Sequence, residues 1–553
     1  MKKLKFLVPI LALAFLSCDQ YLDVNDSPNQ LTFDKATPSK LLPGAQVSTY
    51  RVQVGSMNQL GNVFMNSWTR NVQSFGNGFD KELQLNLDNG FYASIWDGLF
   101  RELKNYQAII DYPNPNGTYD NYVAAAKICK SFYTQYLVDL YGNIPYSEAW
   151  KGNANVTPKY DDDYAIYQSL ITQLEEARNL IDNAPANAED IAPYDVMLEG
   201  DMTKWTEFAN TVQLRLCLRM SECTGAKATY RDSKLAAIAG GPFLSGNVSI
   251  NPGFSGATAD NLTPMISNYF YNTDQSNVQN RTFIAMSGHA WKSLQSYATT
   301  NYPTAGSQEI IAGSGVNYPN LTDPRSGRIF TGGIQGGAVG PRRAVNQGSS
   351  SVNVAAPTTA IPGPPCRLGA LGHIDPYDQV GIFATPPLAA GYPEDFFGVD
   401  GFIMTFSESC FLQAEAAVRY PSLFSGGQTL FEQGITDSFL FRNAAIGTYI
   451  ASINSRPNFG WTGTNTQKLH AIMYQKWIAL MGINGIESFI DYTRTGFPLT
   501  PLSSNATQTR KPYRLVYPVS EYVANSANVP AMSPTDPFAI NTLTPFWVPG
   551  APN

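Results

Sequence analysis

Three consecutive helical stripes between Tyr122 and Met220 most strongly limit how this chain can fold. In the first stripe, apolar residues recur three or four positions apart, which places them on one face of an α-helix. The apolar face holds Tyr122, Ala125, Cys129, Phe132, Tyr133, Tyr136, Leu137 and Leu140, and the other face holds Lys127, Lys130, Ser131 and Thr134. Gly142 and Pro145 end this helix, because glycine tolerates positive φ and proline restricts the residue before it.

Two more helices follow this first one. The second opens at Asp161, Asp162 and Asp163, whose carboxylates suit the positive end of a helix dipole. The third runs from Trp205 to Met220 with the same apolar spacing. Helical hairpins of this kind cannot bury their apolar stripes alone, so they must stack on further helices. The stretch therefore predicts a mainly α scaffold and not a catalytic centre.

The rest of the chain supplies helices for that stacking. Residues 41–65 contain helical stretches, and 91–110 is a clear amphipathic helix. Helices return at Ser407, which we interpret as an N-cap, and continue through a hairpin to Phe439 and a helix over 467–481. The spacing between hairpins is irregular, and no repeat of about 34 residues is kept. The pattern predicts a solenoid-like stack of helical hairpins.

Residues 240–400 differ in character from both flanking regions. Gly, Asn, Pro, Ser and Thr accumulate there, and helical periodicity is kept only in a short helix expected around 282–296. The stretch 332–365 is typical of an irregular loop. Repeat scaffolds often carry binding loops as insertions on one face, so we expect a ligand surface here.

The N-terminus has the pattern of an export signal. A basic segment, 1–5, precedes an apolar run from Phe6 to Leu16 that is too short to span a membrane. Ser17-Cys18 then resembles a lipoprotein processing site, which makes 1–17 a signal peptide and Cys18 the lipidated residue, although Phe15 and Leu16 depart from the usual pattern. The alternative is ordinary secretory cleavage nearby, with Cys18 uninvolved. Residues 18–40, rich in Asn, Ser, Thr and Pro, are predicted to be a flexible tether.

Composition and motifs exclude several kinds of function. A net charge of −7 and the lack of a basic stripe after residue 5 argue against a nucleic-acid partner. The three histidines have no metal-ligand spacing, no Cys-x-x-Cys occurs, and nucleophile and phosphate-loop motifs are absent. We therefore assign no catalytic residue, metal or cofactor, and interpret 161–163 as a helix cap, not a calcium site. Because Asp and Glu residues are plentiful, a catalytic pair of carboxylates like that of a glycosidase remains an alternative.

The remaining cysteines and one histidine have simpler structural interpretations. Cys129 and Cys410 lie in apolar helical patterns and are predicted to be buried thiols. Cys217 and Cys223 are separated by about 9 Å of helix rise, which is too far for a disulfide. His470 lies in a helix and is predicted to be structural.

Candidate ligand-binding residues are aromatic rings beside polar side chains, because a sugar packs its C–H face on a ring and its hydroxyls on polar groups. Such rings lie mostly outside the helical stripes. The candidates are Trp68, Arg70, Asn71, Trp96, Tyr269, Phe270, Tyr271, Asn272 and Trp291. Core packing is the alternative for each ring: it is favoured for Trp96 and Trp291, equally weighted for Trp68, and expected for at least one of 269–271.

Six segments, in order along the chain, resemble the SusD/RagB family of outer-membrane nutrient-binding lipoproteins. They are DLYGNIPYSEAW (139–150), WTEFANTVQLRLCLRMSE (205–222), LTDPR (321–325), ESCFLQAEAAVRY (408–420), QKWIALMGINGIESFIDYTRTGFP (475–498) and RLVYPVSEYVAN (514–525). The resemblance implies tetratricopeptide-like hairpins over one domain, 41–553, with a loop-rich insertion at about 240–400 that builds the ligand surface. Glu415, Asp491 and Arg494 match recurrent family positions, and we interpret them as ion pairs between repeats.

The resemblance also implies a function. We expect a lipid-anchored protein of the outer membrane that captures an oligosaccharide and delivers it, as a lid, to a SusC-like TonB-dependent transporter. Acidic residues after Cys18 resemble a surface-export signal, which favours the outer face over a periplasmic one. Peptides are the alternative cargo. A surface glycoside hydrolase and a protein scaffold are the alternatives from other classes, although we expect a binding protein and not an enzyme.

Overall fold

The computed structural model describes residues 36–74, 78–274, 276–296, 316–331, 342–355, 365–369 and 398–552, together with short strands at 309–310, 334–335 and 338–339. Cys18, the predicted signal peptide and most of the predicted tether lie outside these residues. The tether was expected to reach residue 40, but helix α2 already begins at Pro38. Proline suits this first helical position, because its missing N–H would have no partner there.

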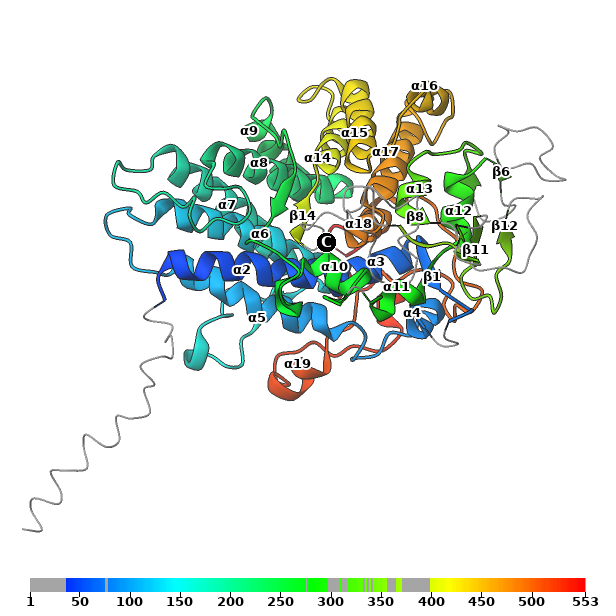
Figure 1. Ribbon diagram of the computed structural model, residues 1–553. Helices are drawn as coiled ribbons and strands as arrows, with labels where there is room; N and C mark the ends of the chain where they lie inside the picture. Colours follow the sequence, from blue (N-terminus) through cyan, green and yellow to red (C-terminus); the bar gives the residue numbers. More distant parts are fainter. Residues whose placement is uncertain are drawn as a thin grey trace, which may run out of the picture.

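The molecule is mainly helical, as predicted (Figure 1), and most of its helices fall into two groups along the chain. The first group comprises α2 (Pro38–Val52), α3 (Asn58–Phe64), α4 (Asp80–Gln84), α5 (Ala93–Ile110), α6 (Asp120–Tyr141), α7 (Asp163–Asp182), α8 (Met202–Arg219) and α9 (Gly225–Ile238). The second comprises α14 (Phe406–Arg419), α15 (Gly427–Phe441), α16 (Tyr449–Asn454), α17 (Asn465–Leu480), α18 (Gly485–Thr495) and α19 (Val519–Ala524). Between them in sequence lie α10 (Pro264–Tyr269), α11 (Gln279–Phe283), α12 (Gly288–Leu294) and α13 (Ser326–Ile329).

Helix α6 lies at the centre of the first group and packs against α2, α5, α7 and α8. Its apolar stripe is buried, as the periodicity predicts. The opposite face was expected to be polar and is also buried except at Lys127, because helices cover it from the other side. Lys130 is accommodated there by a hydrogen bond to Gln107 and by the rings of Tyr146 and Trp150, which lie 4.9 and 4.8 Å from its amine.

Two glycines let the beginning and the end of the chain pack together. Helix α3 crosses α18, and a Cβ at Gly61 would lie 2.0 Å from the carbonyl carbon of Gly485. Only a residue without a side chain permits this approach of two backbones. Asn58 and Asn62 complete the contact, since their side-chain oxygens accept hydrogen bonds from the N–H groups of Gly485 and Gly482, each at 3.0 Å. The crossing joins the two helix groups.

Polar side chains cap several of the helices that the sequence predicted. Asp162 caps α7 by accepting from the N–H of Ala165 at 2.9 Å, which confirms the interpretation of the acidic run as a cap. Thr464 begins α17 with a capping box. The prediction for α14 was wrong: Thr405 is its cap, because its side chain accepts from Glu408 N–H. Ser407 lies inside the helix and donates to the carbonyl of Gly434 at 2.7 Å.

The loop-rich region contains short strands. They are β4 (Val248–Ile250), β5 (Ile284–Met286), β6 (Glu309–Ile310), β7 (Asn317–Tyr318), β8 (Phe330–Thr331), β9 (Ile334–Gln335), β10 (Ala338–Val339), β11 (Arg343–Ala344), β12 (Val354–Ala355) and β13 (Arg367–Leu368). Outside that region lie β1 (Trp68–Arg70), β2 (Ile144–Pro145), β3 (Tyr160–Asp161) and β14 (Gly401–Met404). Antiparallel pairs β6–β7, β9–β10 and β11–β12 form local hairpins.

A four-stranded antiparallel sheet, in the order β1-β5-β13-β8, ties the loop-rich region to the helices. Trp68 pairs with Met286 and Arg70 with Ile284. This pairing also explains why the single helix expected over 282–296 is interrupted. Residues of β5 hydrogen-bond to β1, so α11 ends before them and α12 starts anew with Ser287 as its cap.

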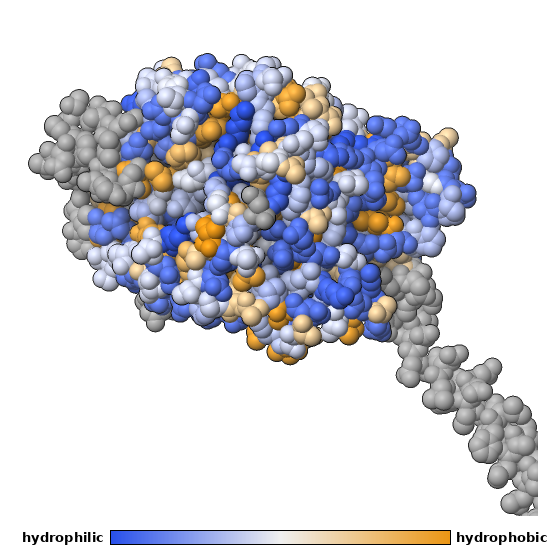
Figure 2. Space-filling view, turned by 180° about the vertical axis from the view of Figure 1, so that it is seen from behind, coloured by the Kyte–Doolittle hydropathy of each residue, from blue (hydrophilic) through white to orange (hydrophobic). Residues whose placement is uncertain are grey.

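The described cysteines and the surface agree with a single buried core. All five described cysteines are free thiols, and Cys129 and Cys410 are buried, as predicted. Large apolar residues that reach the surface include Val156, Tyr194 and Val523. Figure 2 shows hydrophilic residues spread over one face with apolar residues in small separate groups. Within the described ranges, no helix combines the length and the apolar character needed to cross a bilayer.

Candidate functional site

The tryptophans chosen from the sequence are buried side chains of the core. Trp68 is 1% exposed, Trp96 2% and Trp291 3%, so none offers an open ring, and the core alternative that was favoured for Trp96 and Trp291 and equally weighted for Trp68 is the one observed. The Trp68 ring packs edge-on against Tyr269, with centroids 5.3 Å apart. The indole N–H of Trp96 donates to Glu521 at 3.3 Å, and that of Trp291 to the carbonyl of Arg342 at 3.2 Å. Burying rings of this size stabilises the fold, which explains their position.

The run 269–272 is also mostly turned inward. Side chains that alternate along the run would place at least one of its three rings in the core, but all three are buried. The Tyr269 hydroxyl donates to the carbonyls of Val54 and Gly55, at 2.8 and 2.9 Å, which holds α10 on the segment after α2. Asn272 is exposed, and its amide donates to the Ser276 hydroxyl at 2.9 Å.

Arg70 and Asn71 have partners within the protein. Arg70 forms an ion pair with Asp80 at 3.0 Å. The Asn71 amide donates to the carbonyl of Thr282 at 2.9 Å. The ligand-contact role of the nine candidates stays a prediction, but the rings lie beneath the surface and not on it.

A cavity of about 470 Å³, which we call the loop-side cavity, is lined in part by residues that are close in sequence to Trp68 and Trp291. Four segments far apart in the sequence contribute to it: the turn between α3 and β1, helix α12 with β7, the β11–β12 hairpin, and the segment after α18. Its lining residues are Asn66, His289, Lys292, Tyr318, Asn346, Gln347, Ser349, Asn353, Pro501, Leu502 and Ser504.

Two buried polar atoms of the loop-side cavity have no hydrogen-bond partner in the described part of the chain. They are the side-chain oxygen of Asn66 and Nε2 of His289. The other atom of each group is used: the Asn66 amide donates to the carbonyl of Pro501 at 3.1 Å, and His289 Nδ1 lies 3.0 Å from the Tyr318 hydroxyl. Most buried polar groups in folded proteins are paired, so two residues with an unpaired atom in the lining of one cavity make it a candidate ligand site.

The imidazole of His289 is neutral at ordinary pH. Burial, followed by the nearby charges of Lys511 and Lys292, lowers its pKa to about 3. A neutral imidazole offers either one N–H or one lone pair at Nε2, depending on its tautomer. Nε2 can therefore either donate a hydrogen bond to a hydroxyl or accept one from it.

The β11–β12 hairpin supplies amides and hydroxyls to the same cavity. Gln347 anchors it by donating to the carbonyls of Val63 and Trp68, both at 2.8 Å, and Ser504 N–H donates to the Gln347 carbonyl at 3.1 Å. The Asn346 side chain is exposed at the rim. Apart from Lys292, the lining is uncharged and rich in hydrogen-bonding groups, which suits a ligand with many hydroxyls.

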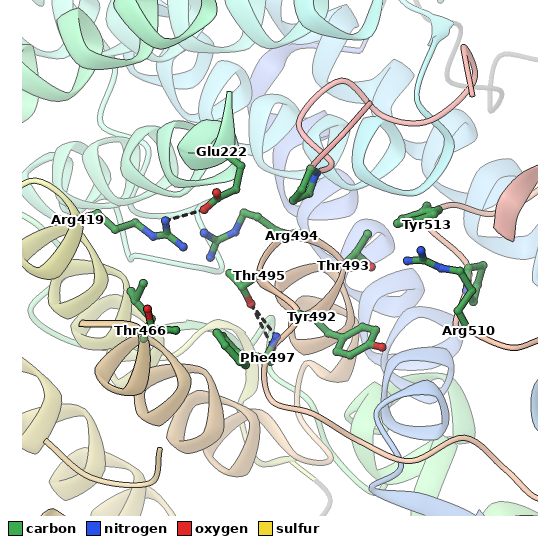
Figure 3. A pocket seen from close by; sticks show the side chains of 14 residues that line it. Glu222, Arg419, Thr466, Tyr492, Thr493, Arg494, Thr495, Phe497, Arg510 and Tyr513 are labelled. Atoms are coloured by element: carbon green, nitrogen blue, oxygen red, sulfur yellow. Dashed lines mark hydrogen bonds and ion pairs between the residues drawn. The ribbon is translucent and has the colours of Figure 1, made fainter. Parts of the chain in front are cut away.

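A second cavity, of about 570 Å³, lies among the helices, and we call it the repeat-side cavity (Figure 3). Its wall comes from the ends of α14 and α18, the start of α17 and the C-terminal segments. Figure 3 shows Arg419 and Glu222 at one side and Arg510 and Tyr513 at the other. The lining residues are Glu222, Arg419, Thr466, Leu469, Tyr492, Thr493, Arg494, Thr495, Gly496, Phe497, Arg510, Pro512, Tyr513 and Pro549.

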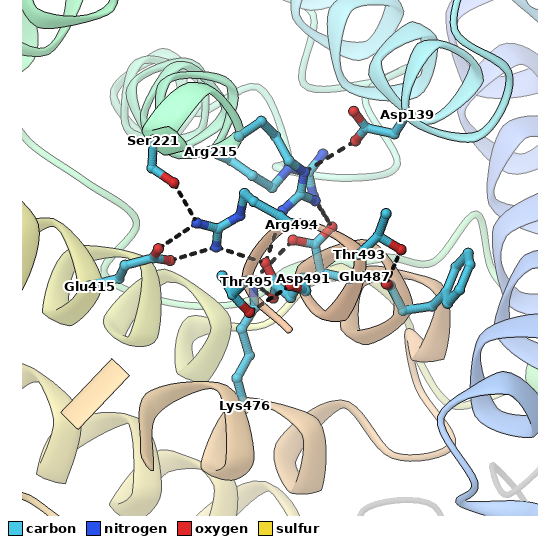
Figure 4. A network of polar contacts seen from close by, with 12 residues as sticks. Asp139, Arg215, Ser221, Glu415, Lys476, Glu487, Asp491, Thr493, Arg494 and Thr495 are labelled. Carbon is cyan, nitrogen blue, oxygen red and sulfur yellow. Dashed lines mark hydrogen bonds and ion pairs between the residues drawn. The ribbon is translucent and has the colours of Figure 1, made fainter. Parts of the chain in front are cut away.

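Close to the repeat-side cavity, a network of charged side chains is buried between the helices (Figure 4). Arg494 pairs with Glu415 and Asp491, which confirms the interpretation of these three residues as ion pairs between repeats. Arg219 and Lys476 extend the network, and each contacts both Glu487 and Asp491. The network is shielded from solvent, so it joins helices and does not present a reactive group to a substrate.

The other predicted structural assignment concerns His470. It is buried, its ring lies 4.6 Å from that of Phe497, and burial lowers its pKa to about 4. This confirms a structural role. In the described ranges, no group of three or more His, Cys, Asp or Glu side chains is arranged to hold a metal ion.

Sequence reasoning located the neighbourhood of the loop-side cavity but not its lining. Asn66 is two residues before Trp68, and His289 is two residues before Trp291. The available signal was the polar run at 346–353, which was treated as irregular loop and instead forms the tip of the β11–β12 hairpin. The amides and hydroxyls of this hairpin line the cavity, whereas the candidate rings do not.

Comparison with known proteins gives one family match and a set of similar folds. The model of the SusD-like family, described as "Starch-binding associating with outer membrane", matches residues 28–296 and 378–518, well over half of the chain. No curated protein matches the sequence significantly.

Several solved structures have the same fold. A chitin-binding SusD homologue from Flavobacterium johnsoniae is 21% identical, with a TM-score of 0.62, over 88% of this chain and 94% of its own. A SusD homologue from Parabacteroides distasonis is 18% identical, with a TM-score of 0.62, over 89% and 93%. A SusD/RagB family protein from Bacteroides thetaiotaomicron is 17% identical, with a TM-score of 0.61, over 94% and 100%. At these identities the likeness shows the fold alone.

Proposed function

This chain belongs to the SusD-like family, described as starch-binding and associating with the outer membrane, and we propose that it captures an oligosaccharide at the loop-side cavity. It would do so by binding and not by turnover. The captured nutrient would pass to a SusC-like TonB-dependent transporter, over which the protein acts as a lid. The Cys18 lipid would hold it at the outer membrane, facing the medium.

One observation carries the choice of site. Asn66 and His289 both line the cavity, and each has a buried side-chain atom without a hydrogen-bond partner in the described residues, the amide oxygen of Asn66 and Nε2 of His289. An unsatisfied buried polar group costs about 1–3 kcal/mol. A sugar hydroxyl both donates and accepts, so one hydroxyl can satisfy either group, and neighbouring hydroxyls can satisfy both. Binding would thus recover part of a cost that the empty protein carries.

The charge of the cavity favours a neutral glycan over a peptide. His289 is neutral, and Asn346, Gln347, Ser349 and Asn353 carry no charge. The single lysine, Lys292, lies with its amine 5.4 Å from the centre of the Tyr318 ring. The structural neighbour from Flavobacterium johnsoniae is described as chitin-binding, and chitin is a neutral glycan.

The test is calorimetric titration of the full chain in detergent with neutral oligosaccharides and, separately, with a peptide digest. Asn346→Ala removes an exposed amide at the rim, and His289→Phe keeps a ring but removes Nε2. Asn183→Ala is the matched control, because Asn183 is an exposed amide that bonds only within α7. We expect saturable binding of one glycan, weakened about tenfold or more by either site variant and unchanged by the control.

Other results would redirect the proposal. Binding of the peptide digest alone, with the same sensitivity to Asn346→Ala, would support the alternative cargo. Release of cleaved sugar from the bound glycan would identify a hydrolase. Glycan binding that both site variants leave intact would contradict the choice of cavity.

Anchoring and delivery need their own measurement in cells. With Cys18→Ala we expect the protein to leave the membrane fraction, and antibody to label intact cells that carry the unchanged protein. Cross-linking on those cells should join the protein to a large β-barrel transporter. Labelling only after cell lysis would contradict the outward orientation.

A further inference from the structure

The repeat-side cavity has an excess of positive charge in a protein that is acidic overall. Arg419, Arg494 and Arg510 line it against the single carboxylate of Glu222, whereas the whole chain has a net charge of −7. A concave site lined by one sign of charge concentrates ligands of the other sign. How much of this positive charge a ligand can use depends on the partners of each arginine.

Two of these arginines are largely neutralised by the protein. Arg494 is held by Glu415 and Asp491, and Arg419 pairs with Glu222 and Glu415, both at 2.7 Å. One polar atom stays unsatisfied even so: Nε of the buried Arg494 has no hydrogen-bond partner in the described residues.

Arg510 differs from the other two because it has no ion pair in the described part of the chain. Its Nε donates to the carbonyl of Lys511 at 3.2 Å, and its guanidinium lies 3.3 Å from the centre of the Tyr513 ring. Only one of its five N–H groups is used in this way. The stacked ring fixes the plane of the guanidinium, which is the arrangement that binds a carboxylate through two parallel hydrogen bonds.

Aromatic side chains complete the wall between the two charged ends. Tyr492, Phe497 and Tyr513 are half-buried and line the cavity, so part of each ring faces it. In Figure 3 the rings of Tyr492 and Phe497 lie between the Arg419 side and the Arg510 side. Such rings pack against the flat face of a cyclic ligand.

We propose that the repeat-side cavity is a second ligand site, which binds a carboxylate attached to a ring, with the carboxylate on Arg510. An acidic sugar unit has this chemistry, and so does a peptide that ends in an aromatic residue. The site shares no lining residue with the loop-side cavity and does not depend on the capture of a neutral glycan there.

The experiment uses the full chain in detergent and ligand-observed NMR titration with two pairs of probes. Glucuronic acid is compared with glucose, and N-acetylphenylalanine with its amide. The two probes of a pair share the same ring and differ at one group, which is a charged carboxylate in the acid and a neutral alcohol or amide in its counterpart. Saturable binding of the acid but not of its neutral counterpart is expected in at least one pair, and the pair that binds distinguishes the sugar source from the peptide source.

Two sets of variants tie the binding to this cavity. Arg510→Gln keeps most of the stem and removes the charge, and Arg101→Gln is its matched control on the exposed surface of α5, where Arg101 contacts only the adjacent Glu102. Thr466 is exposed at the cavity wall, so Thr466→Glu and Thr466→Gln add side chains of equal size that differ only in charge.

We expect Arg510→Gln to raise the Kd for the acid about tenfold or more, because the variant loses the charge-assisted hydrogen bonds to the carboxylate. Thr466→Glu should weaken the binding of the acid more than Thr466→Gln does. Arg101→Gln should leave the Kd for the acid unchanged. A neutral glycan that saturates the loop-side cavity should not displace the acid. No binding of either acid to the unchanged protein, or equal binding to Arg510→Gln, would overturn the proposal.

Discussion

Arg494 holds Glu415 through two hydrogen bonds of 2.5 and 2.8 Å, and this buried pair joins α18 to α14. Glu415→Gln would leave Arg494 without its main counter-charge in a place that water does not reach. Removing one partner of a buried pair costs about 3–5 kcal/mol, so we expect a loss of that size in the free energy of unfolding, measured by chemical denaturation.

The matched control for this change is Glu222→Gln. Glu222 pairs with Arg419 at 2.7 Å, but its side chain is 39% exposed. An exposed pair of this kind contributes about 0–1 kcal/mol. Equal losses for the two variants would contradict the distinction between the buried and the exposed pair.

The same pair gives the protein a defined sensitivity to acid. Burial acts to raise the pKa of Glu415, but the charges of Arg494 and Arg419 outweigh it and hold this pKa at about 2, below the ordinary 4.5. As the pH falls, Glu415 is therefore protonated in the unfolded chain before it is protonated in the folded protein. The stability that ionised Glu415 contributes is complete above pH 4.5 and is lost between there and about pH 2.

This acid sensitivity is measured as the difference in unfolding free energy between the unchanged protein and Glu415→Gln at several pH values. We expect a constant difference from neutral pH to about 4.5 and a steady decrease below it. The Glu222→Gln difference should stay small throughout. A Glu415→Gln difference that does not shrink in acid would contradict the lowered pKa.

Trp68 is expected to act through stability. Its ring is 1% exposed and packs on Tyr269, so Trp68→Ala opens a cavity in the core. Large-to-small changes of this kind cost about 3–5 kcal/mol. We expect thermal and chemical unfolding to show that loss. Tyr194→Ala, at a ring that is 45% exposed, should stay within about 0.5 kcal/mol. A fully stable Trp68→Ala variant would contradict the burial.

The helices could be predicted from the sequence because their signal is local. The stripe of α6 and the cap at Asp162 depend on residues within one or two turns of each other. The ion pairs of Glu415 and Arg494 were recognised only through their family positions. Arg219, which contacts Asp139, Glu487 and Asp491, escaped notice because its partners lie far along the chain.

The loop-side cavity could not be predicted in the same way. Asn66 meets Pro501, and Gln347 meets Val63, across more than two hundred residues, and no local pattern encodes such contacts. Exposure of rings was misjudged for a related reason. Trp68 lies on a short strand of a sheet that is covered by other segments, so a ring outside the helical stripes is still inside the protein.

A glycine next to the loop-side cavity allows a test of its lining in which no lining residue is itself substituted. Gly288 begins α12, and a Cβ there would lie 1.9 Å from the side-chain oxygen of Asn346 and 2.9 Å from a methyl carbon of the buried Val354. Asn346 is exposed and can turn away, and Val354 has to shift by a few tenths of an ångström, so Gly288→Ala should displace the Asn346 amide at some cost in stability. We expect the glycan affinity measured by calorimetry to fall as it does in Asn346→Ala.

The control for Gly288→Ala is Gly44→Ala in α2, where an added Cβ would meet no atom within 4 Å. Alanine is favoured over glycine inside a helix by about 0.5–1 kcal/mol, so this variant should be slightly more stable and should bind the glycan unchanged. The two variants add the same methyl group, and only Gly288→Ala moves Asn346. If both bound the glycan equally well, Asn346 would not be a ligand contact, and the site would have to be sought among the other lining groups of the cavity.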